Sequence, residues 1–236
     1  MSTANLPKRF YKQASIAPGD GGFAVELDGR AIKTPAKAPL MLPSEALASV
    51  VAGEWAAQGE TLDLQGMTLT RLANVAIDHT PRTRPDLAAE LARYAGTDVT
   101  CYLADGPRTL QARQEAAWKP WREWAGRELN VVLVPVIGIM ASPQPQASLD
   151  AVQTHALSLD DFSLTALTWA CSLLGSAVLA LAVQQRALTA PEALALSCVD
   201  EDWQIEQWGE DDEARAVRAA RQTDAEALQL WFEALP

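Results

Sequence analysis

The feature that most constrains this chain is a long uncharged segment in its second half. Residues 162–185 contain no charged side chain, and an apolar helix of about 20 residues can cross a bilayer. However, Thr, Ser, Gly and Ala dilute the segment, and it follows Asp160 and Asp161 instead of basic residues. A helix enclosed by other helices fits this composition better. We therefore expect a helical core around this segment and no membrane insertion.

The first forty residues have a different pattern. Short β-branched and aromatic runs alternate with turn residues, and Asp28-Gly29 between AVEL and RAIKT is a hairpin signal. Helical periodicity begins after Ser44, which we interpret as an N-cap. We predict an α+β fold, with a small β-containing N-terminal domain at residues 1–80 and a larger all-helical C-terminal domain at 81–236.

Several local structures follow from the same patterns. Pro85 is expected to open a helix, and the β-rich run at 97–104 could return to the N-terminal sheet. The apolar run at 131–140 is expected to be a buried connection. A capping box, Thr189 with Glu192, should start a helix that carries the following apolar stripe.

Composition restricts the possible partners. The 236 residues include 30 acidic and 19 basic side chains, a net charge of −11, which disfavours nucleic acid and anionic membranes. The three cysteines are far apart and lie among apolar residues, as expected for small core residues in a reducing compartment. The first residues do not resemble a secretory signal. We expect a monomer in a bacterial cytoplasm, or in the mitochondrial matrix if the chain is a processed eukaryotic protein.

The sequence offers little support for catalysis. It lacks a GxGxxG fingerprint, a phosphate-binding loop and a GxSxG elbow. Only His79 and His155 are present, and neither lies in a metal-binding or nucleophile motif. Carboxylate pairs are too common in so acidic a chain to single out an acid–base dyad. We expect no enzymatic activity, no metal and no cofactor.

The most informative stretch is VDEDWQIEQWGEDDEA at residues 199–214. It holds eight carboxylates and no basic residue, interleaved with Trp203 and Trp208. On a helix, Glu201 falls on the apolar stripe that leads to Trp208, where a carboxylate must be paired, near the helix edge or presented to a partner. A solvated acidic face with helix caps would explain the acids after Gly209. A binding surface for a basic, apolar partner would explain the aromatic residues as well, and the residues alone leave both interpretations open.

Glu54 and Trp55 raise the same question on a smaller scale. Trp55 completes a helical stripe with Leu47 and Val51, which favours a core position. Glu54 beside it is interpreted as a surface residue.

Eight stretches in the same order resemble one known family. They are RFYK (9–12), LDGRAIKTP (27–35), LPSEALASVVAGEWAAQ (42–58), MTLTRLANVAID (67–78), YAGTDVTCYLA (94–104), the spacing of Gln114, Trp118 and Trp121, LGSAVLALA (174–182) and DWQIEQWG (202–209). Together they are similar to the F-type ATP synthase assembly chaperone that binds the alpha subunit, known from mitochondria and alpha-proteobacteria. The resemblance covers nearly the whole chain.

The resemblance implies a protein that uses no cofactor, binds the unassembled alpha subunit and prevents its aggregation until the beta subunit arrives. It also implies a partner-binding role for the acidic C-terminal motif and for the EW pair. These residues are Glu201, Gln204, Trp208, Gly209, Glu210, Asp211, Asp212, Glu213, Glu54 and Trp55. An alternative from another class is a small-ligand-binding protein or enzyme with a carboxylate-lined cleft between its domains. A membrane-anchored assembly factor would instead require residues 162–185 to span a bilayer.

Overall fold

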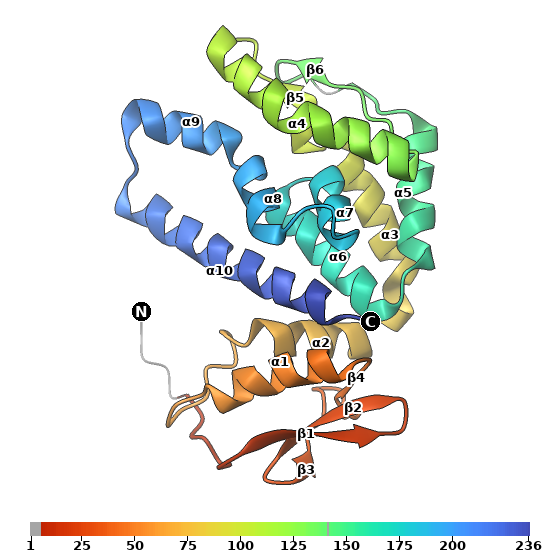
Figure 1. Ribbon diagram of the computed structural model, residues 1–236, viewed down its shortest axis with the longest axis vertical. Coiled ribbons are helices and arrows are strands. Elements are labelled where there is room, and N and C mark those ends of the chain that lie inside the picture. Colours follow the sequence, from red (N-terminus) through yellow and green to blue (C-terminus); the bar gives the residue numbers. More distant parts are fainter. Residues whose placement is uncertain (1–5, 141) are drawn as a thin grey trace. The chain divides into compact units, whose positions relative to one another are not determined.

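The computed structural model describes residues 6–140 and 142–236, in which ten α-helices follow a small N-terminal sheet (Figure 1). This confirms the predicted α+β class. The chain divides into two compact units, one formed by Met1–Arg82 with Leu230–Pro236 and the other by Thr83–Gln229. The predicted N-terminal domain, residues 1–80, did not contain the last seven residues of the chain, which belong to the first unit.

The N-terminal sheet is antiparallel and centred on β2, which pairs with β1 on one edge and with β3 and β4 on the other. Asp28 and Gly29, between β2 and β3, have φ angles of 49° and 76°. Positive φ at both central residues is the geometry that Asp-Gly favours in a tight hairpin, so this prediction is confirmed. The strands are β1 (Ala14–Gly19), β2 (Gly22–Leu27), β3 (Arg30–Ala31) and β4 (Met41–Leu42).

Two helices complete the first unit. Helix α1 (Glu45–Ala56) begins at the predicted N-cap, since the Ser44 side chain accepts a 3.0 Å hydrogen bond from the Leu47 amide. It packs against β1 and β2 and buries Leu47 and Val51 completely. Helix α2 is Thr68–Asp78.

The uncharged segment forms the core of the second unit. It folds as α6 (Asp161–Leu174) and α7 (Ala177–Gln184), so the expected single helix is wrong. Gly175 ends α6 with a φ of 61°, and the Ser176 side chain caps α7. The predicted burial is confirmed, because residues 177–183 are all buried. Within the described ranges, no helix is both long and apolar enough to cross a membrane.

The buried carboxylate of Asp98 links the start of α7 to the 3-10 helix η1, which lies far from it in the sequence. Asp98 precedes η1 (Val99–Cys101) and is fully buried. It accepts hydrogen bonds from the amide and hydroxyl of Thr100, from the Ser176 hydroxyl and from the Val178 amide at 2.9 Å. Burial raises the pKa of the Asp98 carboxyl, while these hydrogen bonds act to lower it. Asp98 is therefore a structural hub of the second unit.

Two expectations about β-rich segments are wrong. The run at 97–104 forms β5 (Tyr102–Leu103), which pairs in parallel with β6 (Val136–Ile137) in the second unit and not with the N-terminal sheet. The segment at 131–140 is largely exposed, up to 94% at Ile139, although it was expected to be buried. Neither run is long enough for its sequence to specify which strand it pairs with.

Helix α7 contacts α4, α6 and α8. Helix α3 begins at Thr80, so Pro85 lies inside it and does not open it as predicted, because the loss of one amide donor in the second turn leaves most hydrogen bonds intact. Helix α4 likewise continues through Pro120. Their bounds are α3 (Thr80–Gly96), α4 (Arg108–Leu129) and α5 (Gln146–Ser158).

The three cysteines are buried free thiols, as their apolar surroundings predicted. Burial raises the pKa of the Cys101 thiol to about 12 and raises the pKa values of Cys171 and Cys198 above their ordinary range. They are therefore protonated, apolar side chains at neutral pH.

Candidate functional site

The acidic stretch begins on a helix that the capping box positions. Thr189 and Glu192 form the predicted reciprocal hydrogen bonds at the start of α8 (Ala190–Ser197). The chain then bends at Cys198, and α9 (Val199–Trp208) begins without a side-chain cap. The expected continuous helix is therefore wrong, and α9 is a separate helix that carries most of the acidic residues.

A short turn reverses the chain after α9. Gly209 ends the helix with a φ of 82°, a conformation that glycine adopts without strain. The Asp211 carboxylate then accepts a 2.7 Å hydrogen bond from the Ala214 amide, which caps α10 (Asp212–Ala234). The predicted helix stop and the predicted start of the last helix are both confirmed, and capping explains why an acidic residue stands at position 211.

Two hollows lie along the space between α9 and α10 in the second unit, and we call them together the α9–α10 groove. The outer hollow, of about 540 Å³, lies near the turn, and the inner one, of about 360 Å³, reaches back to α8. Both are lined by Arg218 and Arg221. The outer hollow gathers seven of the eight C-terminal residues predicted to bind a partner. They are Glu201, Gln204, Trp208, Gly209, Glu210, Asp211 and Glu213.

The outer hollow also exposes apolar surface. The Trp208 side chain is 78% exposed, and Val217 on α10 is 55% exposed. Ile205 adds a partly buried side chain to the same lining. Large aromatic residues so exposed beside charges are typical of protein-binding surfaces.

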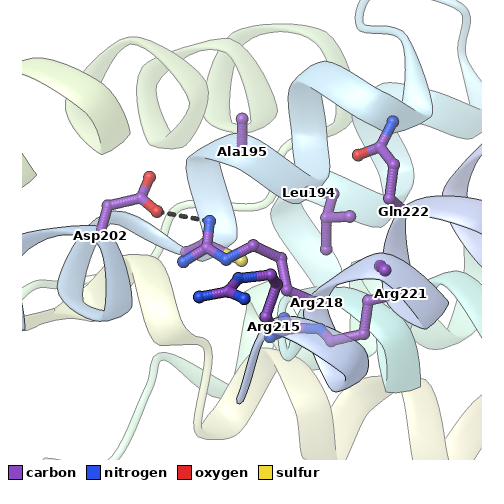
Figure 2. Close-up of a pocket in the computed structure, with 9 residues that line it drawn as sticks. Leu194, Ala195, Asp202, Arg215, Arg218, Arg221 and Gln222 are labelled. Atoms are coloured by element: carbon purple, nitrogen blue, oxygen red, sulfur yellow. Dashed lines mark hydrogen bonds and ion pairs between the residues drawn. The ribbon is translucent and has the colours of Figure 1, made fainter. Parts of the chain in front are cut away.

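Ion pairs connect the two helices across the groove. Arg218 donates a 2.7 Å hydrogen bond to Asp202, as Figure 2 shows, and Arg221 donates to Glu201 at 2.9 Å. The hydrogen bond to Asp202 raises the pKa of Arg218. Glu201, which the sequence placed on the apolar stripe, is thus paired. Sequence reasoning missed both arginines, although Arg215, Arg218 and Arg221 recur at the three-residue spacing that places side chains on one helix face.

The four acids at the turn have different surroundings. Glu210 is mostly buried and lies within ion-pair distance of Arg215 and Arg218, at 3.4 and 3.2 Å. Asp211 caps α10. Asp212, whose side chain is 97% exposed, pairs with Arg215 at 2.8 Å and does not line the groove. Glu213 is exposed and lines the outer hollow. Of these acids, Glu213 is therefore the most available to a partner.

Glu54 and Trp55 belong to the first unit and have local structural roles. The Glu54 carboxylate accepts hydrogen bonds at 2.7 Å from the amides of Leu69 and Thr70, and so caps α2. Burial raises the pKa of Glu54, and these hydrogen bonds oppose that rise. The Trp55 ring packs edge-on against Tyr11 at a centroid distance of 5.8 Å. A partner-binding role for this pair remains a prediction.

One of the two histidines has a clear structural contact. His155 Nε2 lies 2.8 Å from the Gln184 side-chain oxygen, which joins α5 to α7. Among the described residues, no three His, Cys, Asp or Glu side chains are grouped so that they could hold a metal ion.

The described residues thus form a mainly helical fold with an acidic groove that exposes a tryptophan, and comparison with known proteins specifies the family. The model of the ATP12 chaperone protein family matches residues 8–126. The chain is 26% identical over 224 residues to the mitochondrial protein atp12 of Schizosaccharomyces pombe, covering 89% of this chain and 76% of that protein. The chain belongs to the ATP12 chaperone family, as its motifs indicated, and is a chaperone of ATP synthase assembly.

Two solved structures have the same fold over almost the entire chain. The crystal structure of Atp12 from Paracoccus denitrificans superposes with a TM-score of 0.91 at 40% identity, covering 98% of this chain and 99% of that one. The Atu1473 protein of Agrobacterium tumefaciens superposes with a TM-score of 0.92 at 41% identity, covering 98% and 87%. The similarity therefore includes the helices that form the groove.

Proposed function

We propose that this chaperone binds the free alpha subunit of the F-type ATP synthase through the α9–α10 groove and prevents its aggregation until the beta subunit replaces it. The observation that carries the proposal is the gathering of seven predicted partner-binding residues around one hollow with an exposed tryptophan. The client itself is inferred from the family resemblance of the motifs. A ring subunit exposes large interfaces before assembly, and such surfaces aggregate unless they are covered.

The groove has the properties that temporary binding requires. Trp208 and Val217 offer apolar contact area, and the surrounding carboxylates offer pairing to basic groups on the client. Exposed ion pairs add association rate and specificity more than affinity. The complex would therefore form quickly, yet the beta subunit could still displace the chaperone.

The proposal also covers the cellular compartment, the oligomeric state and the lack of a cofactor. The relatives come from mitochondria and from bacteria. We therefore assign the protein to the bacterial cytoplasm, or to the mitochondrial matrix for a processed eukaryotic chain. It acts there as a monomer without cofactor or catalytic activity.

Aggregation of the purified alpha subunit from the same organism tests the proposal. Light scattering of the warmed subunit should fall when this protein is added, and gel filtration should show a complex that contains both chains. An equal concentration of an unrelated acidic protein provides the control for net charge. Unchanged scattering and separate elution of two folded proteins would refute the proposed client.

Paired charge reversals connect the activity to the groove. Glu213→Lys should weaken the complex at least about tenfold, because Glu213 lines the outer hollow and does not cap the helix. Glu123→Lys changes the net charge equally at an exposed position on α4 and should leave binding unchanged. Equal weakening by both variants would mean that only the overall charge matters.

A further inference from the structure

The carboxylates that cross the groove are already paired within the protein. Arg218 and Arg221 of α10 hold Asp202 and Glu201 of α9 at 2.7 and 2.9 Å. These two pairs join the middle of α9 to the first half of α10, and the first turns of α10 are exposed or only partly buried. A basic side chain that approached these carboxylates from outside would therefore compete with the two arginines.

The internal pairing around Arg218 is incomplete. Its Nε lies 3.2 Å from Glu210 Oε1, yet neither that oxygen nor Arg218 Nη2 has a hydrogen-bond partner among the described residues, and both atoms are buried. A buried donor and a buried acceptor without hydrogen-bond partners weaken the arrangement. A different arrangement of these groups can therefore be reached at little free-energy cost.

The charge and the apolar lining of the groove specify the kind of segment that fits. From Val199 to Arg221 the hairpin has eight carboxylates and three arginines, a net charge of −5. The inner hollow is lined mainly by apolar atoms, with Leu194 and Cys198 at its α8 side, and Trp208 supplies apolar surface at the outer end. An amphipathic segment with basic residues between apolar ones complements both properties.

We propose that Arg218 and Arg221 act as internal stand-ins for basic side chains of the client, and that an amphipathic client segment enters the α9–α10 groove by replacing them at Asp202 and Glu201. The inference rests on the proposed function and concerns how its site is controlled. In the free protein the arginines neutralise the groove and keep the two helices together. In the complex they turn to solvent or to Glu210, and the client completes the pairing.

This arrangement predicts an effect opposite to that of most interface substitutions. Arg218→Gln combined with Arg221→Gln removes the internal competitors and frees two carboxylates. Affinity for the purified alpha subunit should therefore increase by about five- to tenfold, chiefly through a slower dissociation rate. If the arginines instead contacted the client directly, the same variant would bind more weakly.

A control variant separates competition from overall charge. Arg93→Gln with Arg127→Gln removes the same two charges from exposed positions on α3 and α4, away from the groove lining. It should change affinity by less than about twofold at physiological salt, because charges beyond a Debye length are screened. An equal increase in both double variants would overturn the proposal.

A double-mutant cycle tests the competition at a single pair. Glu201→Gln removes the shared acceptor and should weaken the complex. In the Glu201→Gln background, Arg221→Gln should have no further effect, because no carboxylate remains to be released. Additive effects would show that Arg221 acts independently of Glu201 and would refute the stand-in role. Circular dichroism of each variant establishes that it is folded.

Hydrogen exchange of the complex distinguishes failure of this inference from failure of the proposed function. If the wild-type chain does not bind the alpha subunit, the proposed function itself is wrong. If it binds but the amides of residues 199–222 show no added protection, the client lies elsewhere and the groove inference is wrong. Protection of both α9 and the first turns of α10, together with tighter binding of the arginine variant, is the expected result.

Discussion

The second unit contains two pairs of consecutive helices that are held together in opposite ways. Helices α6 and α7 bury nearly all of their inward side chains, and every residue at 177–183 is buried. Helices α9 and α10 face each other across a groove and are joined there by partly exposed ion pairs. The first pair is stabilised by burial of apolar area, and the second by interactions that solvent and partners can replace.

This difference separates stability from binding within one unit. Apolar burial contributes about 25 cal/mol per Å² and cannot be exchanged for contacts with another protein without unfolding. An exposed ion pair contributes only about 0–1 kcal/mol and can be exchanged readily. Mutations in α6 and α7 should therefore affect folding first, and mutations along the groove should affect partner binding first.

The largest effect is expected at Asp98, which supports the α6–α7 pair. Asp98→Ala leaves the Ser176 hydroxyl and the Val178 amide without their buried acceptor. The free energy of unfolding should fall by about 4 kcal/mol in a denaturant titration. A loss below about 1 kcal/mol would show that water replaces the carboxylate and that Asp98 is not a hub.

The pH dependence of stability provides a control for this prediction. Because burial raises the pKa of Asp98, its contribution to stability is fully present below the pKa of the unfolded chain and is lost as pH rises through the native pKa. Asp98→Asn cannot titrate. It should therefore flatten the slope of unfolding free energy above about pH 4, the ordinary pKa of an Asp side chain, whatever its effect on absolute stability.

A pair of apolar substitutions compares the two helix pairs directly. Leu167→Ala in α6 removes a completely buried side chain and should lower the free energy of unfolding by about 3 kcal/mol. Trp208→Ala in α9 removes a side chain that is 78% exposed and should change it by less than about 0.5 kcal/mol. Binding to the alpha subunit should fall about tenfold in the Trp208 variant alone. The reverse pattern would contradict the division between core and groove.

A substitution of Glu54 tests whether this residue, which the family resemblance assigns to partner binding, instead stabilises the fold. Glu54→Ala removes the cap of α2 and should lower the free energy of unfolding by about 1–2 kcal/mol. If its role is structural, binding of the alpha subunit by the folded fraction should be unchanged. Weaker binding at unchanged stability would instead assign Glu54 to the client interface.

The smallest effect on stability is expected from added salt. Raising the salt concentration from about 0.1 M to about 0.5 M screens the exposed ion pairs of the groove. The midpoint of thermal unfolding should hardly change, because the core is apolar. The dissociation constant of the complex should increase several-fold in an equilibrium binding assay, and a salt-independent complex would show that apolar contacts dominate the groove.

The parts of the fold that the sequence predicted depend on short-range chemistry. Asp28-Gly29 favours a tight hairpin whatever surrounds it, and Thr189 with Glu192 caps a helix locally. The stop at Gly209 and the cap at Asp211 follow in the same way. Each of these interactions joins residues no more than about four positions apart, so the sequence itself contains the partners.

One group of wrong predictions concerns contacts between residues distant in sequence. The β-rich run at 97–104 pairs with residues 136–137, and no pattern in either segment indicated that choice. The uncharged segment breaks at Gly175 and Ser176 through a local stop and cap, but the packing of the two shorter helices in the core depends on the surrounding elements. Pairing between short strands and packing around a core are decided by the whole unit.

The sequence alone thus determined the α+β class, the burial of the uncharged segment and the residues of the acidic motif, because composition, periodicity and local caps specify them. Only the tertiary structure showed that Arg218 and Arg221 pair with Asp202 and Glu201, and that Glu54 caps α2. Charges separated by 15 to 20 residues interact only when the chain reverses direction and brings two helix faces together. The physical reason is that Coulomb and hydrogen-bond energies depend on distance in space, which the order of residues does not contain.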